Sequence, residues 1–239
     1  MDRTTLTLAA VAFLVGAFNI LVGPTGGVMA GATAALVPPP ASLLLHAGVS
    51  WWSSLWRCVV LRDSIMWRVV LRFALPALPA TFLALLFGVH VSSPAWRIAI
   101  ACYLVAWALS SQVRTLLARQ RSVLIASLIA GVASVVVGAG GVVAMPAIRS
   151  ATESLEQAIA TEAALTVVQN TLKIVMLSLV LHVSLANHAQ HLVTMALSAS
   201  LGLAVGRRTS LKIPAATKDH LLTATLLAVA GWLFFSALR

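Results

Sequence analysis

The sequence predicts an all-α protein that spans a lipid bilayer several times and consists of two related halves. First, 60% of its 239 residues are hydrophobic, 9% are charged, and the mean hydropathy is +0.99. Second, apolar stretches of about 20 residues, enough to cross a hydrocarbon core of ~30 Å, follow one another along the chain. Third, a glycine-rich break in an apolar stretch occurs twice. A soluble domain of this size would need far more polar residues on its surface.

Six stretches have the length and hydrophobicity of ordinary membrane-spanning helices. They are residues 41–60, 68–90, 96–113, 155–183, 188–206 and 217–237. The first apolar stretch, Thr5 to Val22, has the hydrophobicity of a signal peptide, but no small-residue cleavage site leads into a soluble segment. We therefore expect it to be part of the fold.

Two further segments are interrupted and are predicted to form hairpins. Residues 5–40 contain an apolar run broken at Gly23-Pro24-Thr25-Gly26-Gly27, and residues 122–154 contain one broken at Gly138-Ala139-Gly140-Gly141. Irregular backbone at membrane depth is tolerated only where it is buried in protein or faces a water-filled cavity. Interrupted segments at matching positions of two repeats are the best sequence indicator of a transporter's binding site.

The two helices that follow the hairpins share a pattern of polar residues. In the first helix the pattern consists of His46, Ser50, Ser53, Ser54 and Arg57. Adding 116 to each number gives Glu162, Thr166, Gln169, Asn170 and Lys173, all of them polar. The spacing places each set on one face of its helix. The pattern predicts an internal duplication, with one repeat in residues 1–121 and the other in residues 122–239, together forming one transmembrane domain.

The basic residues predict that the second repeat is inverted relative to the first. If each broken segment enters and leaves on the same side, twelve basic residues lie inside. They are Arg57, Arg62, Arg68, Arg72, Arg114, Arg119, Arg121, Arg149, Arg207, Arg208, Lys212 and Lys218. Only Arg3, Arg97 and Arg239 then lie outside, whereas broken segments that cross fully would give a split of nine to six. The excess of basic residues in cytoplasmic loops favours the hairpins and places both termini outside.

The glycine pairs and the polar faces together predict a site for a small anion. A glycine-rich start of a short helix exposes backbone N–H groups, which favour an anion, although small residues also permit close helix packing. Side chains that can donate hydrogen bonds should face a cavity rather than lipid. The predicted substrate-binding residues are Thr25, Gly26, Gly27, Ser50, Ser53, Ser54, Gly140, Gly141, Thr166, Gln169 and Asn170.

Three ionisable residues are candidates for proton coupling or gating. Glu162 is the only acidic residue well inside a predicted span, and its counterpart in the first repeat is His46. Either side chain could change protonation as an anion passes, or the two could form a structural pair. Lys173 could attract an anion from the outer vestibule, or its side chain could extend to the interface. We assign Arg57 to the inner basic cluster.

Composition and motifs exclude several other classes of function. The net charge of +10 lies in short clusters between apolar spans, which indicates membrane topology rather than nucleic-acid binding. Cys58 and Cys102 lack the spacing of a metal or redox site, so we expect no metal and no cofactor. His46 and Ser50 lie one turn apart, but no orienting carboxylate follows and no HExxH or GxSxG motif occurs, so an enzyme is not expected. A channel, a carrier for another small anion, a structural subunit and a homo-oligomer all stay open.

The second break and the helix after it resemble the TauE/SafE group of sulfite and organosulfonate exporters. The resemblance lies in the glycine-rich break, the following proline and the helix rich in small and hydroxyl residues: Gly138 to Pro146, then Ala158 to Lys173. Gly23 to Gly27, Pro38 to Pro40 and Ala41 to Arg57 form the first copy. The resemblance implies a carrier of the bacterial inner membrane that exports small sulfur-containing anions. We expect alternating access, with the two hairpin tips meeting near the midplane.

Overall fold

The computed structural model describes residues 3–22, 26–38, 40–88, 93–110, 123–136, 138, 140–180, 182–184, 186–210 and 215–238. All regular structure in these residues is helical, which confirms the predicted all-α class. The α-helices are α1 (Arg3–Val22), α2 (Gly26–Leu36), α3 (Ala41–Val60), α4 (Trp67–Gly88), α5 (Ser93–Leu109), α7 (Val123–Val136), α8 (Gly140–Ser150), α9 (Leu155–Leu179), α10 (Ala189–Ser210) and α11 (Ala215–Ala237). Two 3₁₀ turns, η1 (Arg62–Ser64) and η2 (Ala186–His188), precede α4 and α10.

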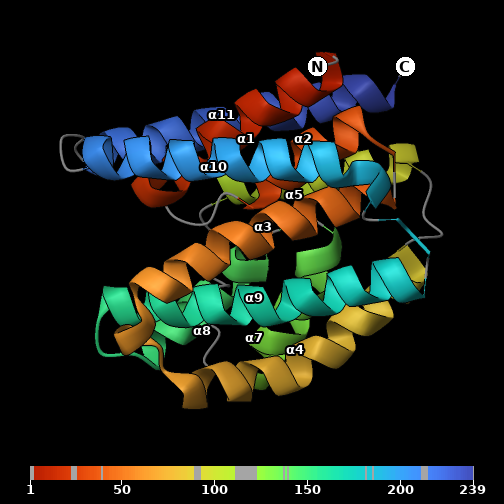
Figure 1. Cartoon of the computed structure of the whole chain (residues 1–239). Helices are drawn as coiled ribbons and strands as arrows, with labels where there is room; N and C mark the ends of the chain where they lie inside the picture. Colours follow the sequence, from red (N-terminus) through yellow and green to blue (C-terminus); the bar gives the residue numbers. More distant parts are fainter. Residues whose placement is uncertain are drawn as a thin grey trace.

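The helices form two layers with α3 running between them (Figure 1). One layer contains α1, α2, α5, α10 and α11, and the other contains α4, α7, α8 and α9. The main packing partners are α1 with α10, α4 with α7, α5 with α11, and α3 with α9. Each of these pairs joins one helix from residues 3–110 to one from residues 123–238, so the two halves of the chain are interleaved.

The observed helices agree with the predicted ones to within a few residues. The predicted hairpin 5–40 corresponds to α1 and α2, and the predicted hairpin 122–154 corresponds to α7 and α8. The predicted helices 155–183 and 96–113 end earlier than expected, because α9 ends at Leu179 and α5 at Leu109. His182 has a φ of 52°, a left-handed conformation that cannot continue a helix.

Small residues allow the helices to approach closely. A β-carbon on Gly202 would overlap the carbonyl oxygen of Phe13, and one on Gly206 would overlap that of Ala17. Both contacts join α10 to α1. The GxxxG pattern of α10 is therefore a packing surface for α1, as small residues at membrane-helix interfaces generally are.

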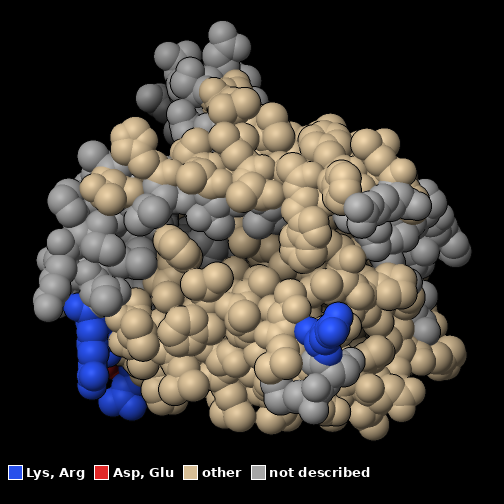
Figure 2. All heavy atoms as spheres, turned by 90° about the horizontal axis from the view of Figure 1, so that it is seen from above, with Lys and Arg blue, Asp and Glu red and all other residues tan. Residues whose placement is uncertain are grey.

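The outer surface carries many large apolar side chains. On α4 these are Trp67, Leu71, Leu75, Phe82, Leu83 and Phe87. Among its described atoms, the face drawn in Figure 2 shows charged side chains only in small, separate groups, at the lower left and on the lower right of the view. Two helices of the described chain, Trp67–Phe87 and Ala186–Arg208, are long and apolar enough to cross a membrane by length and composition alone. An apolar surface of this extent is typical of contact with lipid.

Candidate functional site

The two glycine-rich breaks touch each other inside the fold. A β-carbon on Gly26, the first residue of α2, would overlap the carbonyl oxygen of Gly138. Gly138 precedes α8 and has a φ of 63°, in the left-handed region that glycine adopts without strain. α2 and α8 have 11 residues each, so each is about 16 Å long at ~1.5 Å per residue, roughly half a bilayer core. Two short helices thus begin close to one point in the protein.

A cavity of about 50 Å³ lies where the breaks meet. Its walls come from α1, α2, α3, α7, α8 and α9, and every lining residue in the described part of the chain is polar, charged or glycine. They are Asn19, Gly26, His46, Ser50, Ser53, Ser54, Arg57, Ser134, Gly138, Gly140, Gly141, Glu162, Thr166, Gln169, Asn170 and Lys173. A polar lining inside an apolar protein is what a binding site for a charged solute requires.

Most of the predicted site residues converge on this cavity. Nine of the eleven predicted substrate-binding residues line it, as do the three coupling candidates. Gly27 is buried but does not line the cavity. Thr25 lies outside the described residues. The two polar faces meet because α3 packs against α9.

Arg57 and Glu162 form a buried ion pair across the α3–α9 contact. Arg57 Nη1 lies 2.9 Å from Glu162 Oε2, and the two side chains are 14% and 2% exposed. The hydroxyl of Thr166 donates to Glu162 Oε1 at 2.8 Å, and Arg57 Nη2 donates to Ser54 Oγ at 3.0 Å. Arg57, which we assigned from the sequence only to the inner basic cluster, thus also belongs to the cavity wall. The buried carboxylate of Glu162 needs a counter-charge, and the long arginine side chain supplies it.

Lys173 is a buried cation with no acidic partner. Its side chain is 3% exposed, and its Nζ donates to the backbone carbonyl of Ser134 at 3.0 Å. Within the described part of the chain, no carboxylate lies within ion-pair distance of it. Lys173 thus neither extends to the interface nor lies in an outer vestibule. By formal charge, with Arg57 and Lys173 as cations and Glu162 as an anion, the described lining residues carry one net positive charge.

Several polar atoms of the cavity wall are free to bind a solute. Among the described residues, five buried atoms of lining side chains have no hydrogen-bond partner: Asn19 Oδ1, His46 Nδ1, Arg57 Nε, Gln169 Nε2 and Asn170 Oδ1. Buried polar atoms are almost always hydrogen-bonded in native proteins. Clustering of such atoms around one small cavity indicates that the cavity holds a polar or charged solute.

The comparison with known protein families identifies the chain. The family described as Sulfite exporter TauE/SafE matches residues 8–233. The chain belongs to the TauE/SafE family. This confirms the resemblance seen in the glycine-rich breaks. TauE/SafE proteins are membrane transporters, which agrees with the apolar helices and the apolar outer surface of this protein. Searches of curated proteins and of solved structures gave no match.

Four lining residues of this TauE/SafE protein were missed as site residues from the sequence: Asn19, Arg57, Ser134 and Gly138. Asn19 lies seven residues before Gly26 in the sequence, and Ser134 lies six residues before Gly140. A polar residue at that position in an otherwise apolar run was a usable signal. Gly138 belongs to the second break, but only its position against Gly26 shows that it lines the cavity.

Proposed function

We propose that this TauE/SafE protein is a secondary transporter that exports a small sulfur-containing anion, sulfite or an organosulfonate, across the bacterial inner membrane by alternating access. One observation carries the proposal: a polar cavity with an unpaired lysine lies where the two glycine-rich breaks meet. Interrupted helices of two repeats that meet around a cavity are the usual architecture of a secondary transporter's site.

The chemistry of the cavity favours an anion. Gly26 and Gly140 each begin a short helix, whose first N–H groups and dipole attract negative charge. Lys173 adds a buried ammonium group, and the amide of Gln169 adds a free donor. Oxygen atoms of a sulfur oxyanion can accept hydrogen bonds from all of these groups.

The volume of the cavity favours a compact solute. A cavity needs about 10–15 Å³ to hold one water molecule. A cavity of about 50 Å³ therefore holds only a few groups of that size. Sulfite fits this limit better than a sulfonate with a long organic tail. The volume of the cavity therefore favours a small inorganic oxyanion as the main substrate.

The helix packing supports two inverted repeats in residues 1–121 and 122–239. Under the duplication, α1 corresponds to α7 and α4 to α10, so the α1–α10 and α7–α4 pairs are equivalent. The α3–α9 and α5–α11 pairs each join a helix to its own counterpart. A two-fold relation produces this pattern of contacts. In our proposal one repeat rocks against the other around the cavity.

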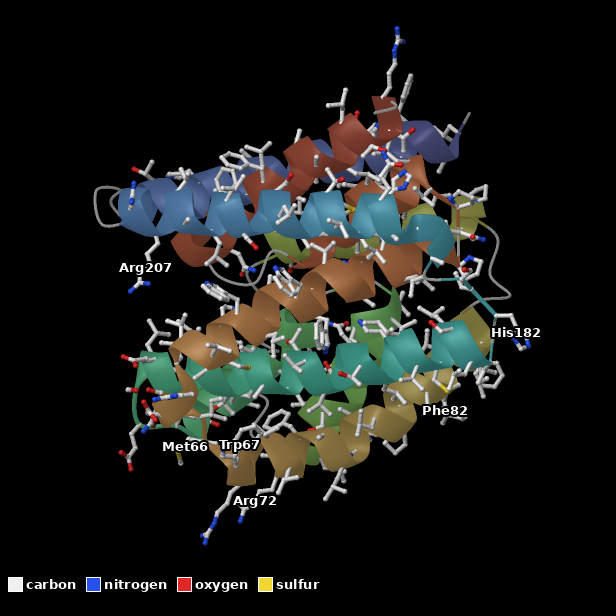
Figure 3. All side chains as sticks on the ribbon, viewed as in Figure 1. Met66, Trp67, Arg72, Phe82, His182 and Arg207 are labelled. Carbon is white, nitrogen blue, oxygen red and sulfur yellow. The ribbon has the colours of Figure 1, made fainter. Side chains whose placement is uncertain are left out.

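The distribution of basic residues supports a multi-pass orientation with both termini outside. Arg72 and Arg207 lie toward one end of the helices and His182 toward the other (Figure 3). Basic residues favour the cytoplasmic side. In a chain with Cys58 and Cys102 replaced by serine, we expect a membrane-impermeant maleimide to label Asp63→Cys only in inside-out vesicles. Asn187→Cys should be labelled only from the outside; the reverse result would refute this orientation.

Sulfite flux into liposomes that contain the purified protein tests the proposed function. We expect saturable flux without single-channel currents, and a decrease of about tenfold for Asn170→Ala, because a lost hydrogen bond to a charged group costs ~1.5–3 kcal/mol. Val175→Ala, on a lipid-facing position of the same helix that is 44% exposed, is the matched control and should transport normally. Equal flux in both variants would contradict the site.

A further inference from the structure

The charged residues of the cavity break the symmetry between the two repeats. Arg57 and Lys173 occupy matching positions in α3 and α9, and so do His46 and Glu162. Arg57 pairs with Glu162 at 2.9 Å. Lys173 lines the same cavity as His46, whose imidazole offers no negative charge. One of the two cations is therefore neutralised and the other is not.

We propose that Glu162 selects the charge of the transported anion: by neutralising Arg57 it leaves Lys173 as the single free cation among the described lining residues, and the site prefers a monovalent anion to a divalent one. This rests on the proposed function, because it assumes that the cavity binds the transported anion. In this proposal Glu162 determines which anion the cavity prefers, in addition to holding α3 against α9 through its ion pair with Arg57.

The physical reason is the cost of net charge in a buried site. Glu162, Lys173 and His46 are 2%, 3% and 4% exposed, so water screens their charges poorly. A monovalent anion brings the cavity with Lys173 to neutrality, whereas a divalent anion leaves one uncompensated negative charge. An uncompensated buried charge costs several kcal/mol. Apart from these three residues and Arg57, the lining residues carry no ionisable side chain.

The geometry shows which substitution isolates this effect. Glutamine in place of Glu162 keeps an oxygen that can accept the hydrogen bond from Thr166, and it keeps the volume of the side chain. It removes the negative charge and puts an amide N–H₂ group where the oxygen that faces Arg57 was, so Arg57 loses its acceptor and becomes a second free cation. Arg57 Nε already lacks a hydrogen-bond partner among the described residues, so this side chain is positioned to take part.

The experiment compares two anions of nearly equal size, methanesulfonate with one charge and sulfate with two. Dissociation constants are measured by titration calorimetry on the full-length protein in detergent, at one pH and one ionic strength. We expect the unsubstituted protein to bind methanesulfonate more tightly. In Glu162→Gln the preference for sulfate over methanesulfonate should rise by about tenfold or more, the effect of one added charge in a poorly screened site.

A second variant, in which both partners of the ion pair are made neutral, tests the same role of Glu162. Arg57→Gln combined with Glu162→Gln restores one free cation, so its preference should return toward that of the unsubstituted protein even if Glu162→Gln alone folds poorly. A double variant that prefers sulfate would overturn the role of Glu162, as would an unchanged preference in Glu162→Gln. If neither anion binds the unsubstituted protein, this role of Glu162 fails; if sulfite does not bind it either, the proposed function fails as well.

Discussion

Replacing Lys173 with methionine is expected to weaken anion binding and sulfite flux by roughly a hundredfold, because loss of one partner of a buried charge contact costs about 2–5 kcal/mol. Methionine keeps the length of the side chain and removes the only cation of the cavity that has no acidic partner among the described residues. The fold should survive, since a buried charge is itself costly for stability. Flux into liposomes and calorimetric dissociation constants measure the effect.

Arg72→Met provides the matched control for this substitution. Arg72 is an exposed residue of α4 whose side chain points away from the protein (Figure 3). Its loss removes the same charge from the chain but not from the cavity, so flux should stay within about twofold of normal. If Lys173→Met behaved like Arg72→Met, Lys173 would not bind the anion.

The second large effect is expected for Gly138→Val, which should abolish transport and lower the unfolding temperature in detergent. A β-carbon at this position would lie 2.5 Å from Ala30 Cβ and 2.7 Å from His46 Nε2. A β-branched residue in the left-handed conformation costs a further ~1–3 kcal/mol. The substitution therefore separates the two glycine breaks at their point of contact.

Gly231→Ala is the control for the glycine substitution. Gly231 lies in α11, and a β-carbon there would meet nothing within 4 Å. Alanine is preferred to glycine in a helix by ~0.5–1 kcal/mol, so thermal stability should stay the same or rise. A normal unfolding temperature and normal flux for Gly138→Val would show that the breaks need not touch.

The polar faces of α3 and α9 could be predicted from the sequence because polar residues stand out in apolar helices. The polar residues from His46 to Arg57 have the same spacing as those from Glu162 to Lys173, which places each set on one face of its helix. Because α3 packs on α9, both faces line the same cavity. The ion pair was not predictable in this way. Arg57 lies near the end of its helix, where a basic residue normally marks the cytoplasmic side. Only the folded structure shows that it reaches Glu162, 105 residues away in the chain.

The lengths of the apolar stretches predicted the helices well, but not the partners of each helix. The GxxxG pattern of Gly202 and Gly206 indicated close packing without naming α1 as the partner. Patterns of small residues recur in many membrane helices and fit several neighbours equally well. Which helices meet depends on the whole arrangement, which no single segment determines.

The interleaving of the two halves has a consequence for how the protein is made. The chain is synthesised from its N-terminus, so in the proposed multi-pass arrangement α1 enters the bilayer long before its main partner α10 exists. Until then, lipid must cover the surface of α1 that Gly202 and Gly206 later contact. Lipid tails are as apolar as leucine, so the delay costs this surface little. The buried polar side chains of α3 are different. His46 and Arg57 are inserted before Glu162 has been synthesised, so until then residues of the first half alone must keep these side chains from contact with lipid.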